Sequence, residues 1–87
     1  MATWRELIER EMKKRGESFK DVISIAPYNL DLDKEFSSGY GLIEGDAFTL
    51  WTNDYVYFPS DYDGAEEAES VPRNPNKEIT RHIGGGG

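Results

Sequence analysis

Hydrophobic and polar residues alternate along this chain with two different periods, and each period predicts a different kind of element. Near the N-terminus, four apolar residues recur at the three- and four-residue spacing of a helical stripe. The stripe consists of Trp4, Leu7, Ile8 and Met12. Thr3 and Glu6 have the spacing of a capping box, and Gly16 suits the end of a helix. The pattern predicts a helix between Thr3 and Gly16 whose apolar stripe lies in the core.

A weaker start signal follows almost at once. Ser18 and Asp21 repeat the capping spacing, and the apolar Phe19, Val22 and Ile23 continue it until Pro27. We therefore predict a second helix that ends near Ala26. A DNA-binding helix–turn–helix needs a basic recognition helix, and this one offers only Lys20, so the pair is not interpreted as a DNA-binding motif.

Beyond residue 46, the period changes to that of strands. Three runs, Phe48 to Thr52, Tyr55 to Phe58 and Ala65 to Val71, are separated by turn signals at Asn53-Asp54 and Asp63-Gly64. They predict a three-stranded antiparallel meander. The expected fold is α+β, with two N-terminal helices packed on this meander in one domain (1–83) and a flexible glycine tail (84–87). Residues 77–83 fit a short helix or a further strand.

Composition excludes several classes of protein. There is no cysteine, no apolar run of about 20 residues and no apolar signal-peptide core, so we expect a cytoplasmic protein without membrane contact. No phosphate-binding loop, nucleophile elbow or pair of histidines is present. Asp31, Asp33 and Glu35 resemble the start of a calcium loop, but Phe36 and Leu42 stand at its glycine and glutamate positions. We expect no enzyme, no cofactor and no metal site.

Charge is the most informative property of the composition. The net charge is -7, and residues 27–72 carry Lys34 as their only basic residue against eleven acidic residues. A field of one sign repels nucleic acid and acidic membranes and steers the protein toward basic surfaces. The same acids also serve solubility, so a purely solubilising role is the alternative.

The acids and tyrosines of the meander form the candidate partner-binding surface. Its expected members are Asp54, Tyr55, Tyr57, Asp61, Tyr62, Asp63, Glu66, Glu67 and Glu69. Carboxylates can imitate backbone phosphates on a basic protein surface, and tyrosines supply contact area. For Glu66, Glu67 and Glu69, the alternative role is to guard an exposed edge strand against unwanted pairing.

The size, acidity and expected element order resemble those of small phage-encoded inhibitors of bacterial defence, the anti-CRISPR proteins and other DNA mimics. Several stretches resemble such phage proteins, namely FTLWT (48–52), VYFP (56–59), YDGAE (62–66) and SVPRNP (70–75). The resemblance implies an inhibitor in the host cytoplasm that occupies the nucleic-acid-binding surface of a defence protein.

Two alternatives belong to other classes. One is a structural or accessory subunit that self-associates as a homodimer through the aromatic face of the sheet. The other is a ubiquitin-like carrier, because the chain ends in glycines, although that fold opens with a β-hairpin and not with helices.

Overall fold

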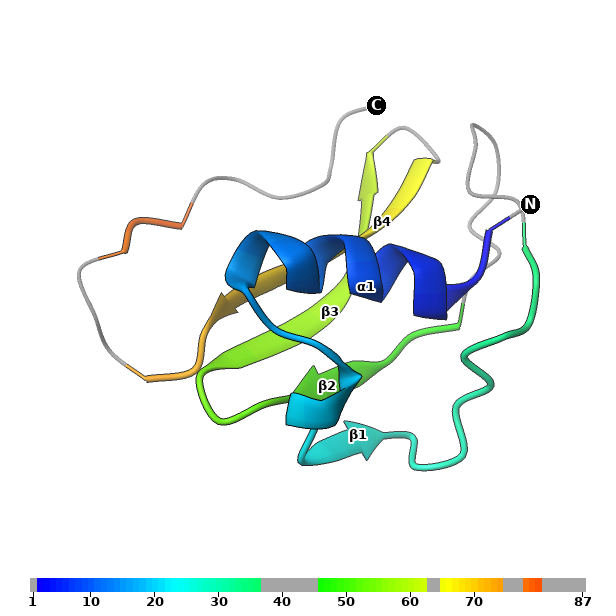
Figure 1. The fold of residues 1–87 in the computed structure, drawn as a ribbon. Coiled ribbons are helices and arrows are strands. Elements are labelled where there is room, and N and C mark those ends of the chain that lie inside the picture. Colours follow the sequence, from blue (N-terminus) through cyan, green and yellow to red (C-terminus); the bar gives the residue numbers. More distant parts are fainter. Residues whose placement is uncertain (1, 37–45, 63–64, 75–77, 81–87) are drawn as a thin grey trace.

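The computed structural model describes residues 2–36, 46–62, 65–74 and 78–80. One α-helix, α1 (Trp4–Arg15), packs across one face of a four-stranded antiparallel sheet with the strand order β1-β2-β3-β4 (Figure 1). The strands are β1 (Ser24–Ala26), β2 (Thr49–Trp51), β3 (Tyr55–Tyr62) and β4 (Ala65–Pro72). One turn of 3-10 helix, η1 (Phe19–Asp21), lies between α1 and β1. The described residues form a small α+β domain.

The predicted first helix is confirmed, and so are its boundaries. Thr3 Oγ1 accepts a hydrogen bond from the backbone N–H of Glu6 at 3.2 Å, which satisfies one of the free donors at the helix start. At the other end, Gly16 adopts a left-handed conformation with φ 72°, which glycine accepts at low cost. The apolar stripe is buried as expected.

The prediction of a second helix is wrong. Ser18 and Asp21 do form a capping box, in which Asp21 Oδ2 accepts from the backbone N–H of Ser18 at 2.9 Å. The helix nevertheless ends after one 3-10 turn. Val22, Ile23 and Ile25 are β-branched and favour extended backbone, and the Ile23 N–H donates to the carbonyl of Trp51 at 2.9 Å.

The prediction of three strands is also wrong, because the residues released from the expected helix become β1. Ser24 pairs with Trp51, and Ile25 pairs with Leu50. The three strands of the expected meander correspond to β2, β3 and β4, each antiparallel to the next. β1 could not be predicted from the local sequence pattern, because it is stabilised by pairing with β2, more than 20 residues away.

The core lies between α1 and the sheet, and Trp4 is its largest member. The Trp4 ring packs against Phe36 and Phe48, with centroid distances of 4.9 Å to each ring. Its indole N–H donates to the backbone carbonyl of Asp46 at 2.9 Å. Ala2 and Phe36 exchange two backbone hydrogen bonds of 2.8 Å, so the segment after β1 is held against the start of α1.

The C-terminal predictions are only partly covered. Residues 78–80 belong to neither a helix nor a strand. The other residues of the expected helix or strand at 77–83, and the glycine tail, lie outside the described residues.

Candidate partner-binding surface

The sheet has one face covered by α1 and one face that is not. On the covered face, Leu50, Tyr57 and Ala68 join the core cluster. Alternation along the strands places the neighbouring residues on the opposite face. There Trp51 pairs with Val56, Val56 pairs with Val71, and Phe58 pairs with Glu69. We call this surface the open face; it comprises Trp51, Val56, Phe58, Glu67, Glu69 and Val71.

The apolar residues of the open face form a continuous row across β2, β3 and β4. Trp51, Val56 and Val71 are each partly exposed, and none of them belongs to the core cluster. Within the described part of the chain, no helix or strand packs on them. A partly exposed aromatic and aliphatic row of this kind is typical of a surface that meets another protein.

Two of the nine predicted site residues lie in the interior, which corrects the predicted surface. Tyr57 is 0% exposed and Glu66 is 3% exposed. Both side chains point to the covered face, because Tyr57 pairs with Ser70 and Glu66 pairs with Asp61. Neither residue can present its side chain to a partner in this conformation.

Tyr57 is held by a half-buried cluster of hydroxyl groups around the carboxylate of Glu17. Its hydroxyl donates to Glu17 Oε1 at 2.6 Å, and the Thr52 hydroxyl lies 2.9 Å from Glu17 Oε2. Burial, followed by the hydrogen bond and the negative charge of Glu17, raises the pKa of Tyr57 well above its ordinary value. The cluster fixes the loop after α1 to the β2–β3 turn, because Thr52 Oγ1 also accepts from the N–H of Tyr55 at 3.0 Å.

The remaining predicted residues are spread over three places. Tyr55 is half-buried beneath the guanidinium of Arg15, 4.4 Å from its ring centroid, and Asp61 is half-buried on the covered face. Asp54 is exposed at the β2–β3 turn. The side chain of Tyr62 and all of Asp63 lie outside what the structure describes.

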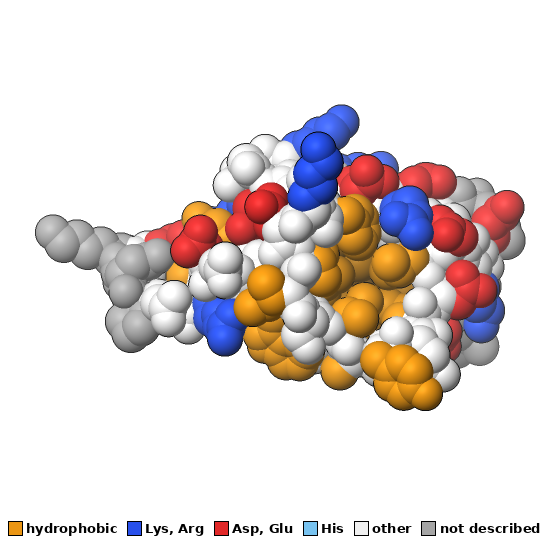
Figure 2. All heavy atoms as spheres, turned by 60° about the horizontal axis from the view of Figure 1, so that its bottom comes forward, with side chains coloured by type: hydrophobic (Ala, Val, Ile, Leu, Met, Phe, Trp, Pro, Cys, Tyr) orange, Lys and Arg blue, Asp and Glu red, His pale blue; other side chains and the backbone are white. Residues whose placement is uncertain are grey.

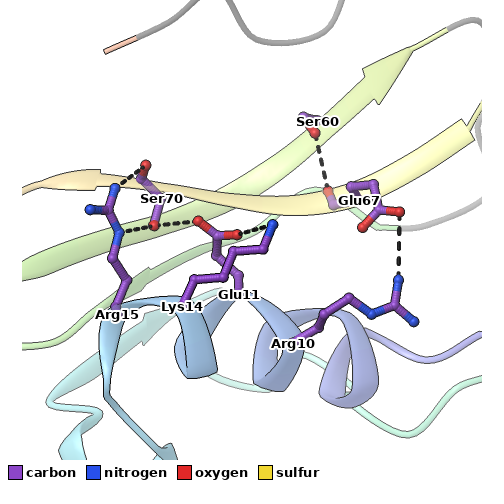
Figure 3. A network of polar contacts seen from close by, with 7 residues as sticks. All are labelled: Arg10, Glu11, Lys14, Arg15, Ser60, Glu67 and Ser70. Atoms are coloured by element: carbon purple, nitrogen blue, oxygen red, sulfur yellow. Dashed lines mark hydrogen bonds and ion pairs between the residues drawn. The ribbon is translucent and has the colours of Figure 1, made fainter. Parts of the chain in front are cut away.

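Glu67 and Glu69 are the two predicted residues that the structure brings together on the open face. Glu67 is exposed, and its one ion pair among the described contacts, to Arg10 at 3.7 Å, joins two exposed side chains. Such pairs contribute little and yield readily to a competing charge. By strand alternation, the open face therefore carries an apolar row at one end and these two carboxylates at its β4 edge. There Glu67 reaches Arg10 of α1 (Figure 3), and Glu69 lines the cleft between α1 and β4.

A network of polar contacts ties α1 to β4 (Figure 3). The Ser70 hydroxyl donates to Glu11 Oε2 at 2.6 Å and accepts from Arg15 Nε at 2.8 Å. Lys14 pairs with Glu11 at 3.4 Å, and Arg15 pairs with Glu78 at 2.9 Å. These residues also line a cleft of about 340 Å³ between α1, β4 and residues 78–80. The charged side chains that line the cleft contact one another, so we interpret the cleft as the seam where α1 packs against β4 within the fold.

Other kinds of site find no support among the described residues. No group of three or more His, Cys, Asp or Glu side chains in those ranges could hold a metal ion. None of the helices described there is long and apolar enough to span a bilayer. Comparison with protein-family models, with curated proteins and with solved structures finds no match for this chain.

The predicted site residues left out the apolar half of the open face, and the burial of Glu11 and Glu66 was not predicted. Strand parity separates Trp51, Val56 and Phe58 from Leu50 and Tyr57. Parity does not say which face a helix covers. The burial of Glu11 also had a signal, since it stands seven residues after Trp4 on the apolar stripe of α1.

Proposed function

We propose that this protein is a small binding module that docks its open face on a basic protein surface. The observation that carries the proposal is the sheet face on which no described helix or strand packs, where the row of Trp51, Val56 and Val71 lies beside Glu67 and Glu69. α1 packs against the opposite face of the sheet. A binding role needs nothing else from the chain, and no catalytic step is included.

The chemistry of the open face specifies the kind of partner. Its apolar row fits apolar or aromatic side chains, and the adjacent carboxylates fit Lys or Arg at the border of the contact. The net charge of -7 adds a longer-range attraction toward positive surfaces. The fitting partner is a protein with an apolar patch bordered by basic side chains.

A basic surface of this kind is typical of proteins that bind nucleic acids. We therefore extend the proposal to inhibition: the module occupies a surface that otherwise holds DNA or RNA, as the resemblance to phage-encoded inhibitors implies. The buried Tyr57 and Glu66 take no part in the contact.

The test begins with capture of partners from a bacterial extract on the immobilised protein. Each captured protein is then purified, and its binding is measured alone and with rising concentrations of duplex DNA or structured RNA. The proposal expects at least one binary complex that weakens with salt and is displaced by nucleic acid. Binary complexes that are insensitive to both would contradict it.

Self-association is a second candidate function, and one observation favours it. The partly exposed apolar row could pack against the same row of a second copy, as in homodimers with apolar interfaces. The variant Phe58→Glu places a charge beside this row. If the row is the dimer contact, Phe58→Glu lowers the mass seen in sedimentation; a wild type that sediments as a monomer at every concentration removes this candidate.

A further inference from the structure

The two outer strands of the sheet are protected very differently. β4 is the outer strand on one side, and the Arg73 N–H donates to the carbonyl of Asp54 at 2.8 Å. From this bond, the alternation of antiparallel pairing turns the backbone groups of Glu66, Ala68 and Ser70 away from β3. All three residues are buried, and the Ser70 carbonyl accepts from Arg15 Nη2 at 3.0 Å. α1 therefore occupies this edge at Ser70, and the residues beside it are buried.

β1 is the outer strand on the other side, and its edge is open. Ser24 and Ala26 are exposed, and the chain turns away after Pro27 toward the start of α1, where the Arg5 N–H donates to the carbonyl of Leu32 at 2.9 Å. Among the described elements, none lies beyond β1 in the sheet (Figure 1). The edge thus keeps backbone groups available to another strand.

The segment around β1 lacks the charges that normally guard such an edge. Residues 22–30, with the sequence VISIAPYNL, contain no charged residue in a chain that is 31% charged. Ile23 is 52% exposed and Tyr28 is 89% exposed. Figure 2 shows this side of the molecule, with hydrophobic side chains gathered at the centre and charged side chains around them. Charge is the common guard that this edge lacks, whereas Pro27 ends the three-residue β1 and limits pairing to residues 24–26.

We propose that β1 pairs antiparallel with β1 of a second copy, so that the four strands of each copy join into one continuous sheet. A two-fold axis near Ile25 brings Ser24, Ile25 and Ala26 of each copy against the same residues of the other. We infer that the pairing strand comes from a second copy. Residues 22–30 carry no charge, so two copies of this segment do not repel each other, whereas a charged strand from another protein would lack an opposite charge to pair with. Ile23 and Tyr28 supply exposed apolar area next to the paired strands.

This dimer would double the docking surface. The two-fold axis of an antiparallel strand pair is perpendicular to the sheet, so both open faces lie on the same side and both α1 helices lie on the other. A partner with two basic surfaces would then bind with avidity. This consequence rests on the proposed function, but the dimer itself does not.

The test is sedimentation velocity of the whole chain over a wide range of concentrations, with three variants. Ala26→Lys places a charge on the β1 edge, Asn53→Lys adds the same charge at the exposed β2–β3 turn, and Phe58→Glu places a charge on the open face. Circular dichroism confirms that each variant is folded. We expect the mass of wild type, Asn53→Lys and Phe58→Glu to rise from 9.9 kDa toward twice that value, and Ala26→Lys to stay at 9.9 kDa.

Amide hydrogen exchange gives an independent readout of the same contact. At dimer-forming concentrations, the amides of residues 24–26 become more protected in the wild type and not in Ala26→Lys. A wild type that stays monomeric, or a dimer that survives Ala26→Lys, overturns the proposal. If the wild type forms the dimer but binds no partner with a basic surface, the proposed function is contradicted and the dimer proposal is not.

Discussion

At the scale of single residues, Glu17 is the side chain that organises the β2–β3 turn. Its carboxylate accepts from the hydroxyls of Tyr57 in β3 and of Thr52, the residue after β2, and these bonds join the loop after α1 to the sheet. The sequence shows Glu17 only as a polar residue between two helical signals. Its role depends on Thr52 and Tyr57, which are 35 and 40 residues away, and no local pattern reveals such distant contacts.

The first prediction concerns the buried phenol of Tyr57. Its pKa in the folded protein is raised above the value of about 10 found in an unfolded chain, so folding favours the neutral phenol. The resulting stabilisation is fully present below pH about 10 and is lost as the pH rises above that value. We expect the free energy of unfolding in urea to fall more steeply above pH about 10 in the wild type than in Tyr57→Phe. Parallel curves would show that Tyr57 titrates normally.

The second prediction concerns Asp33, which accepts from Arg5 Nε at 2.7 Å and from Arg5 Nη2 at 3.2 Å. The hydrogen bonds from Arg5 hold the pKa of Asp33 below its ordinary value. The pair therefore stabilises the fold above the ordinary pKa of Asp and is lost as the pH falls through the folded value. In Arg5→Gln, an NMR titration should show the pKa of Asp33 rising toward the ordinary value of an aspartate. An unchanged pKa would mean that Arg5 does not hold it.

At the scale of elements, the first helix was predictable because its caps and its stripe are local. The second was not, because the real capping box at Ser18 is followed by β-branched residues whose partner strand begins at Thr49. The capping box at Ser18 therefore starts only one 3-10 turn, and the residues after it form β1 because they pair with β2. Elements whose stability comes from distant contacts are the ones that sequence patterns miss.

The third prediction concerns the seam between α1 and β4. Ser70→Ala removes the donor to the buried Glu11 carboxylate and one acceptor of Arg15. Because it leaves a buried charge short of a partner, we expect the free energy of unfolding to fall by about 2 kcal/mol. Ser60→Ala is the matched control on β3, where the hydroxyl lies 3.4 Å from the carbonyl of Glu67.

Chemical denaturation measures both variants under the same conditions. We expect Ser60→Ala to change the free energy of unfolding by less than about 0.5 kcal/mol, as is usual for partly exposed sites. Equal losses in the two variants would show that the Glu11–Ser70–Arg15 network contributes nothing beyond an ordinary surface hydroxyl.

At the scale of the whole molecule, the sequence predicts how much negative charge there is but not where it lies. Glu66 and Asp61 turn toward α1, while Glu67 and Glu69 turn toward the open face. Asp31, Asp33 and Glu35 lie on a different segment, which is held against the start of α1. A single acidic platform does not form. The surface that best fits a partner is smaller and half apolar, and its aromatic members were not among the predicted site residues.

The most direct test of the central claim is the affinity of the open face for a purified partner when its charge is reversed. We compare Glu67→Lys/Glu69→Lys with Glu9→Lys/Glu35→Lys, which makes the same change in net charge on exposed residues elsewhere. Docking through the open face predicts that the first pair weakens binding by about tenfold or more and that the second changes it by less than about threefold. Equal weakening by both pairs would show that only total charge matters, and would contradict the account.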